Sequence, residues 1–481
     1  MTVRLLAFFC VTRLLLQAAE PADPFGPVRD KIRQILHPRP GITSPPSIAV
    51  AVVKDGKIVW EEGFGWAELE KGAATAHTVY PLSSVTKMFT GVGLMTLVKS
   101  GKVDLDKPAN DYLGDAKIVG RGGDARDATV RRLANHTAGL PIYFWFSYAD
   151  RPEPSRPIDA VVMFPPGETV RYSNLGYGVL GQIIAHVSGQ PYEDFMRKQV
   201  FEKLGLTETS FGPASTDAGF ATSYATDGNP LPRFVADPEA AMGIYSSVHD
   251  LARFAMFLLK TPLPDQQPIL ADAQIDEMQK PTGMVGKDAG WGIGSAVSIL
   301  PSGQRIIAHV GDMKGASGTV RLIPSEKLAI IALSNFESSL PNIVANQIMN
   351  IMLRAKPQQP GEPALRPVTM ETRPSLDPIR GAWTGIMHTP KDDQPVSLRV
   401  SDGDIVNVKI AQHPETSLAV GSWRNNELRG QLHGPFDSVA LDLLFRGNKL
   451  SGSATVVTED PERNGNAVSY YVELNTHSNP K

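Results

Sequence analysis

The most informative stretch of the chain is VYPLSSVTK, residues 79–87, which places a serine and a lysine at the start of a helical pattern. Apolar residues recur after it at three- and four-residue spacing, and a lysine and a glycine follow as helix C-terminal signals. This pattern predicts a helix over residues 84–100. Ser84 and Lys87 then lie three residues apart on one helix face, within hydrogen-bonding reach of each other.

This pair has the composition of an activated nucleophile. A serine hydroxyl attacks a carbonyl once a base takes its proton, and Lys87 can be that base if burial or nearby cations lower its pKa. The partial positive charge of the helix N-terminus adds to the effect at Ser84. The spacing alone is weak evidence, because Ser478 and Lys481 repeat it in a polar tail. The alternative is a capping serine and a solvated lysine.

A second candidate element is Tyr172-Ser173-Asn174. In an extended segment, residues two apart point the same way, so the phenol and the amide can address one cleft. The phenol of Tyr172 can relay a proton, and the amide of Asn174 can hydrogen-bond a substrate carbonyl. A surface tyrosine in a turn is the alternative.

The third element is His309-Val310-Gly311, at the end of a predicted strand, followed by Asp312. Gly311 would let a substrate backbone approach the strand edge closely. The backbone N–H just after it could join that of Ser84 in an oxyanion hole, where donors meet the negative charge of acyl transfer. The alternative is a strand-end histidine before a glycine turn.

The order of predicted elements indicates an α+β fold. An Asp-Gly turn joins β-rich runs 48–53 and 57–60 as a hairpin, and further runs appear much later in the chain. Helical patterns lie between these early and late runs, so we expect an antiparallel sheet with a helical insertion. The late runs are 305–310, 319–323 and 328–333, and the further helical patterns are 177–188, 192–204 and 248–259.

The C-terminal part differs in composition. Prolines crowd residues 356–378, which predicts a linker between a domain at 25–355 and a second one at 379–481. The second domain carries short β-rich runs that indicate a small all-β barrel of about eight strands, and its Gly381-Ala382-Trp383 resembles the start of a lipocalin-type barrel. These runs include 396–400, 405–410, 439–445 and 468–474.

Residues 1–19 have the shape of a signal peptide: an arginine, apolar runs and then small residues. Arg13 interrupts the apolar region, and an unusual cytosolic leader is the alternative. Export favours a secreted or periplasmic protein. The single cysteine, Cys10, lies inside this leader, so the mature chain is expected to have neither disulfides nor a thiolate site.

The remaining composition excludes several function classes. The chain has 47 basic and 50 acidic residues, so it offers nucleic acid no basic attractor. No apolar run approaches the roughly 20 residues that span a bilayer. The sequence contains neither a glycine-rich phosphate loop nor a paired-histidine metal helix, and we therefore expect no cofactor and no metal.

Taken together, the three elements resemble the family of class C β-lactamases, D-alanyl-D-alanine carboxypeptidases, D-aminopeptidases and family VIII esterases. The resemblance covers about residues 30–350 and includes the flanking stretches 133–141 and 242–247. It implies a β-lactamase/transpeptidase-like fold without cofactors. In relatives with an added barrel, that barrel helps assembly or limits access to the cleft.

The resemblance also implies roles for individual residues. Ser84 would be acylated, Lys87 would accept its proton, and Tyr172 would assist proton transfer to the leaving group and from water. Asn174 would orient the substrate, and Asp312 would supply the second oxyanion N–H. His136 and Thr137 belong to a structural stretch of the family and are left out of the site.

Two positions depart from the family pattern. His309 stands where β-lactamases usually have lysine and supplies only a pH-dependent positive charge, which favours an esterase or peptidase over an efficient β-lactamase. The carboxylate of Asp312 would repel an oxyanion, so we expect it to turn away, toward Lys314.

The preferred hypothesis is a serine hydrolase that cleaves short esters or peptides with D-residues. A weak β-lactamase or penicillin-binding carboxypeptidase is the first alternative, and a non-catalytic assembly or ligand-binding protein with a hydrolase-like shell is the second. A homo-oligomer is left open. The aromatic stretch 143–148 is expected either to wall the cleft or to pack beneath a loop.

Overall fold

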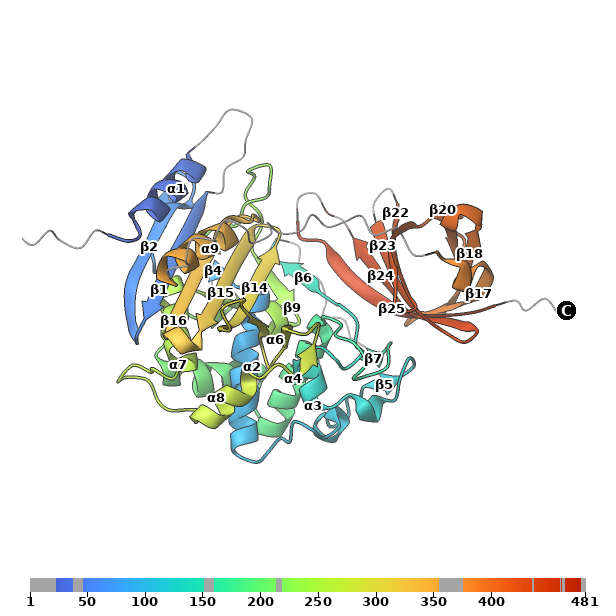
Figure 1. Ribbon diagram of the computed structural model, residues 1–481, viewed down its shortest axis with the longest axis horizontal. Helices are drawn as coiled ribbons and strands as arrows, with labels where there is room; N and C mark the ends of the chain where they lie inside the picture. The colour runs from blue at the N-terminus through green and yellow to red at the C-terminus, as the bar shows by residue number, and fades with distance from the viewer. Residues whose placement is uncertain are drawn as a thin grey trace, which may run out of the picture.

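The computed structural model describes residues 23–37, 46–150, 160–212, 219–353, 375–434, 437–458, 460 and 463–476. It shows a larger α+β body, which contains both the early and the late strands of its sheet, and a smaller all-β body at the C-terminal end (Figure 1). The predicted leader, Cys10 and nearly all of the predicted linker lie outside the described residues. Within these residues, no helix is both long enough and apolar enough to cross a membrane.

The larger body is built on an antiparallel sheet, as predicted, and nine strands of this sheet are described. Its first hairpin turns at Asp55 and Gly56, both with positive φ. The order across the sheet is β11 (Gly283–Met284), β12 (Ala289–Trp291), β13 (Ala296–Ile299), β14 (Arg305–Met313), β15 (Ala316–Ile323), β16 (Leu328–Ser334), β1 (Ser47–Lys54), β2 (Lys57–Glu68) and β3 (Gly72–Ala73).

Both faces of this sheet are covered, because alternate residues of β1 enter two different cores. Ile48 and Val50 pack with α1 (Gly26–Leu36) and α9 (Leu340–Met352) on one face. Ala49 and Ala51 join the main core on the other face, toward the helical insertion. The hydrophobic run of β1 therefore reads as continuous because no face of it meets water.

The insertion surrounds α2 (Thr86–Lys99), which is buried on nearly all sides. The predicted helix over 84–100 differs at its start, since Ser84 lies in a 3-10 turn, Ser83–Val85, that precedes α2. The predicted helix over 192–204 is also divided, into α5 (Tyr192–Met196) and two irregular turns. The other helices are α3 (Val130–Ala134), α4 (Asn174–Ser188), α6 (Glu239–Met242), α7 (Val248–Leu258) and α8 (Asp272–Met278).

Seven short strands connect these helices in three small sheets. Their bounds are β4 (Tyr80–Pro81), β5 (Val119–Gly120), β6 (Trp145–Tyr148), β7 (Val161–Val162), β8 (Ser210–Phe211), β9 (Phe234–Asp237) and β10 (Ile244–Ser246).

The smaller body is a nearly closed barrel of nine strands, one more than predicted. Apolar side chains fill its core, and the indole N–H of the buried Trp383 donates to the Ile379 carbonyl at 2.8 Å. The likeness to a lipocalin stays a prediction. The strand order is β20 (Thr416–Ser417), β19 (Ile405–Ile410), β18 (Asp393–Ser401), β17 (Gly381–His388), β25 (Asn466–Thr476), β24 (Lys449–Thr458), β23 (Asp437–Arg446), β22 (Glu427–His433) and β21 (Ala419–Arg424).

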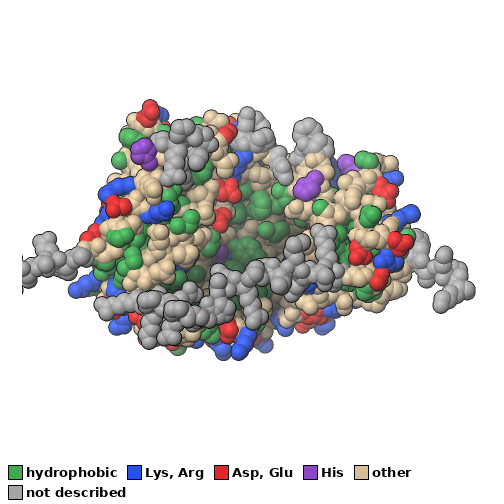
Figure 2. Space-filling model, turned by 45° about the horizontal axis from the view of Figure 1, so that its top comes forward, with side chains coloured by type: hydrophobic (Ala, Val, Ile, Leu, Met, Phe, Trp, Pro, Cys, Tyr) green, Lys and Arg blue, Asp and Glu red, His purple; other side chains and the backbone are tan. Residues whose placement is uncertain are grey.

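The two bodies meet beside the central sheet. Phe144 and Ala467 form an antiparallel backbone bridge, in which each N–H donates to the other residue's carbonyl. The hydroxyl of Tyr148 donates to the Asn464 carbonyl at 3.0 Å. Figure 2 shows that the molecular face is hollowed here, with hydrophobic side chains inside the hollow.

Candidate active site

The turn that carries Ser84 is held against the end of the sheet. Ser83 has a positive φ of 48°, and its hydroxyl donates to the Asp312 carbonyl at 3.0 Å. A Cβ at Gly311 would overlap the Leu82 carbonyl oxygen, so only glycine permits this approach. Gly311 therefore allows close approach of the protein's own backbone at Leu82. We expected it to allow close approach of a substrate backbone.

Lys87 is fully buried, and its amine lies 3.1 Å from the Ser84 hydroxyl. The same nitrogen donates to Asn174 Oδ1 at 2.8 Å and to the Ala241 carbonyl at 2.9 Å. Burial lowers the pKa of Lys87 well below its ordinary value. A neutral amine has two hydrogens and one lone pair, so the two carbonyl-type partners leave the lone pair for the Ser84 proton.

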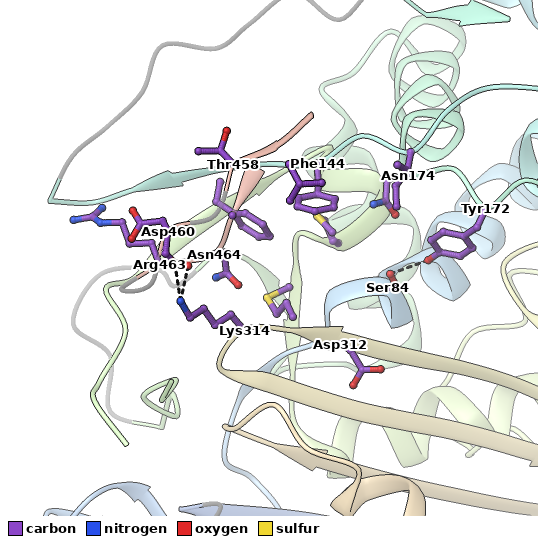
Figure 3. A pocket seen from close by; sticks show the side chains of 16 residues that line it. Ser84, Phe144, Tyr172, Asn174, Asp312, Lys314, Thr458, Asp460, Arg463 and Asn464 are labelled. Carbon is purple, nitrogen blue, oxygen red and sulfur yellow. Dashed lines mark hydrogen bonds between the residues drawn. The ribbon is translucent and has the colours of Figure 1, made fainter. Parts of the chain in front are cut away.

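Tyr172 completes the group from a different part of the chain. Its hydroxyl donates to the Ser84 oxygen at 2.8 Å (Figure 3). Burial raises the pKa of Tyr172 far enough to keep it a phenol in the free protein. Ser173 caps α4 by accepting the Gly176 N–H at 2.9 Å, which fixes the segment that carries Tyr172.

His136 is absent from the predicted site, yet it holds Tyr172 in place. Its ring lies 4.4 Å from the Tyr172 ring, its Nδ1 accepts the Ser173 N–H at 3.1 Å, and its carbonyl accepts the Arg171 N–H at 2.7 Å. Burial lowers the pKa of His136 well below its ordinary value. The signal for it in the sequence is its place in the stretch 133–141, which we interpreted as purely structural.

The ring of His309 lies near that of Tyr172. The motif that contains His309 falls within β14 and not at its end, because this strand continues to Met313. The His309 ring is 6.4 Å from the Tyr172 ring and 5.5 Å from that of Trp291. Burial lowers the pKa of His309 to about 3. His309, which we predicted to bind substrate with only a pH-dependent positive charge, is therefore an uncharged imidazole near neutrality.

Asp312 turns its carboxylate away from Ser84 and Tyr172, as the oxyanion argument required (Figure 3). The prediction that the Asp312 carboxylate turns toward Lys314 was wrong. Lys314 instead donates to the backbone carbonyls of Asp460 at 2.7 Å and Arg463 at 3.0 Å, both in the barrel domain. The role of the Asp312 N–H as a second oxyanion donor stays a prediction.

The group lies in a cleft of about 780 Å³ that both domains line. Ser84, Tyr172, Asn174 and Asp312 line it, whereas His309 and Gly311 are not among its lining residues. Phe144 and Phe146 of the aromatic stretch face the cleft, and Tyr143 instead donates its hydroxyl to Asp237 at 3.0 Å. The barrel contributes Val457, Thr458, Asp460, Arg463, Asn464 and Gly465.

An ion cluster lies beside the cleft and joins the domains. Arg171 Nη1 lies 2.8 Å from a carboxylate oxygen of Glu427 and 2.8 Å from one of Asp442. Arg429 adds a contact of 2.6 Å to Glu427. We call Arg171, Glu427, Arg429 and Asp442 the interdomain ion cluster. Nothing in the sequence indicated it, since its members come from two domains.

Residues 32–348 match the protein-family model described as Beta-lactamase. Protein flp from Staphylococcus aureus (strain N315) is 24% identical over 325 residues, which are 63% of this chain and 63% of that protein. Penicillin-binding protein 4* from Bacillus subtilis (strain 168) is 26% identical over 318 residues, which are 60% of this chain and 68% of that protein.

Two solved structures are similar over both domains. The crystal structure of SurE has a TM-score of 0.62 at 22% identity and covers 92% of this chain and 98% of its own. The octameric penicillin-binding protein homologue from Pyrococcus abyssi has a TM-score of 0.58 at 23% identity and covers 92% of this chain and 99% of its own. At these identities the likeness shows the fold.

Proposed function

Because this chain belongs to the beta-lactamase family, we propose that it is a serine hydrolase that cleaves esters or amides through an acyl-enzyme on Ser84. One observation carries the proposal: the Ser84 oxygen lies 3.1 Å from the Lys87 amine and 2.8 Å from the Tyr172 hydroxyl, at the wall of a cleft. A nucleophile, a base and a proton relay within hydrogen-bonding distance are the parts that acyl transfer needs.

In this mechanism, the lone pair of Lys87 accepts the Ser84 proton while the Ser84 oxygen bonds to the carbonyl carbon. Backbone N–H groups of Ser84 and Asp312 receive the developing oxyanion. Tyr172 gives its proton to the leaving oxygen or nitrogen as that bond breaks, and Lys87 returns a proton to the phenolate. Water then attacks the acyl-enzyme along the reverse proton path, which releases the acid and restores Ser84.

We propose short esters and peptides with D-residues as substrates. Phe144, Phe146 and Met313 give the cleft an apolar side, which suits an uncharged acyl group. His309 is neutral and adds no cation for a substrate carboxylate. This disfavours efficient β-lactam hydrolysis and keeps a weak β-lactamase as the alternative.

The test is Ser84→Ala assayed with p-nitrophenyl esters and a fluorophosphonate label. We expect kcat/KM to fall about 10⁴-fold or more and labelling to disappear, because the nucleophile is gone. Ser83→Ala is the matched control, and it should keep its label. Mass spectrometry should place the acyl adduct on Ser84 in the unmodified protein. Unchanged turnover in Ser84→Ala would contradict the proposal.

We also propose that the chain is exported and forms a homo-oligomer. The leader-like residues 1–19 support export, and the octameric homologue from Pyrococcus abyssi supports assembly. N-terminal sequencing of protein recovered outside the cytoplasm tests the first, and light scattering after gel filtration tests the second. An intact leader or a monomeric mass would contradict the respective proposal.

A further inference from the structure

Outside the cleft, two histidines and a glutamate converge from three separate segments. Glu61 lies in β2, His77 in the segment before β4, and His249 in the first turn of α7. One ligand atom from each of the three lies within 4.8 Å of the others. Glu61 and His249 are half-buried, and His77 is exposed, so an ion could enter from solvent.

The hydrogen bonds of this cluster fit the surroundings of a metal ion. His77 Nδ1 lies 2.8 Å from Glu208 Oε1, and His249 Nδ1 lies 2.9 Å from Glu61 Oε2. Metal-binding histidines usually present one ring nitrogen to the ion and hold a carboxylate with the other. The Glu208 carboxylate at Nδ1 of His77 favours the Nδ1–H tautomer of that ring, which leaves Nε2 with a lone pair. Glu61 Oε2 and His249 Nδ1 already face each other at 2.9 Å, so an ion would take the place of the proton between them, and both atoms would be ligands.

The backbone holds these groups in place. The Glu208 N–H donates to Asp250 Oδ2 at 2.7 Å, which orients the carboxylate that contacts His77. The His249 N–H donates to the Ala76 carbonyl at 3.2 Å and ties α7 to the segment that carries His77. The two imidazole rings lie 4.7 Å apart between centroids. The cluster is thus oriented before any ligand arrives.

We propose that Glu61, His77 and His249 bind one divalent transition-metal ion of the zinc class. Two imidazoles and a carboxylate are a donor set that suits Zn²⁺, with water as the fourth ligand. Tetrahedral bonds of about 2.1 Å need ligand atoms about 3.4 Å apart. The donor atoms must therefore close by at most about 1.4 Å, which rotation of the exposed His77 side chain can supply.

The ion would join β2, α7 and the segment that leads to Ser84, and so would stabilise the larger domain. The sequence predicts no metal, because it contains no paired histidines on one helix. Here the ligands are far apart in the chain and meet only in the fold.

Calorimetric titration of the EDTA-treated full chain with ZnCl₂ at about pH 7.5 tests the proposal. We expect one ion per chain, a dissociation constant in the micromolar range or below, and a raised melting temperature. His77→Ala and Glu61→Gln should each weaken binding at least tenfold. His433→Ala, at an exposed histidine of the barrel, is the matched control and should bind as the unmodified chain does.

Three outcomes would overturn the proposal: no zinc binding, equal binding by His77→Ala, or loss of binding in His433→Ala. Because His77 is exposed, His77→Ala should keep its fold, so weaker binding by this variant would reflect loss of a ligand. Circular dichroism checks that the fold is kept. Ester hydrolysis is a separate readout, because the metal site does not depend on the proposed function.

Discussion

Arg171 and Tyr172 are neighbours in the chain, but their side chains enter regions of opposite electrostatic character. Tyr172 joins Ser84 and Lys87, a group in which burial disfavours the charged forms of Lys87 and Tyr172. Arg171 joins Glu427 and Asp442, where a cation meets two carboxyl groups across the domain boundary. The first region performs proton transfer in the proposed mechanism, and the second joins the two domains.

The difference lies in the partners that accompany burial. Lys87 is buried with amide and carbonyl oxygens as its hydrogen-bond acceptors, so the low dielectric disfavours its ammonium form. Arg171 is also buried, but it is paired with the carboxyl groups of Glu427 and Asp442, which offset the cost of burying its charge. A buried basic group without a counter-charge tends to lose its proton and can act as a base. A buried cation that is paired with carboxyl groups instead serves as a structural contact.

Among the variants that test this comparison, the largest effect is expected from removing the buried base, Lys87. Lys87→Met keeps the length of the side chain but has no lone pair for the Ser84 proton, so kcat should fall by about 10³-fold. Lys87→Arg should fall similarly, because a guanidinium stays protonated. Steady-state ester hydrolysis measures both. Activity close to that of the unmodified protein in either variant would contradict the role of Lys87.

The second-largest effect is expected from removing the paired cation, Arg171. Arg171→Met leaves two partly buried carboxyl groups with only the more exposed Arg429 as a cation and should lower the free energy of unfolding by about 3 kcal/mol. Because Tyr172 is the next residue, kcat should also fall, by about tenfold, with less change in KM.

Urea unfolding and steady-state kinetics of Arg171→Met measure these two changes. Arg429→Met is the matched control, and its more exposed guanidinium should contribute less than about 1 kcal/mol. Equal effects of the two variants would show that Arg171 has no special position beside Tyr172.

The smallest effect is a pH dependence of stability. Burial, with a hydrogen bond to Glu427, raises the pKa of Asp442 to about 7. The folded protein then holds a proton that the unfolded chain releases between about pH 4 and 7, so stability should fall as pH rises through this window. Asp442→Asn should lose this decline, of about 1–2 kcal/mol between about pH 5 and 8.

Urea unfolding at about pH 5 and pH 8 compares Asp442→Asn with the unmodified chain. Below about pH 4.5 the stability should instead fall as the pH falls. The burial of Glu427 is outweighed by its hydrogen bonds, which lower its pKa to about 2, so the folded protein resists protonation of this group. An unchanged decline above about pH 5 in Asp442→Asn would assign the pH dependence to another group.

The main features of the fold could be predicted because they depend on local patterns. Alternating and continuous apolar runs predicted the strands, and the Asp55-Gly56 turn predicted their first connection. The ninth strand of the barrel could not be predicted, since β20 has only two residues and offers no period. The start of α2 was misplaced because Ser84 lies in a 3-10 turn that has the same local spacing.

The candidate site likewise has features that local motifs predict and features that depend on contacts between distant residues. Ser84, Lys87 and Tyr172 occur in motifs, and the structure brings these three side chains together. The neutral state of His309 could not be predicted, because it depends on burial by Trp291 and other residues distant in the sequence. Arg171 likewise gains its partners only when the barrel packs against the larger domain.

The backbone bridge between Phe144 and Ala467 has a consequence for how new specificities could arise. One wall of the cleft belongs to a domain that holds none of the reacting groups. Substitutions in its lining residues, such as Val457, Thr458 and Asn464, can therefore reshape the cleft while the chemistry stays intact. Selection can thus act on substrate size and on reaction rate through separate parts of the gene.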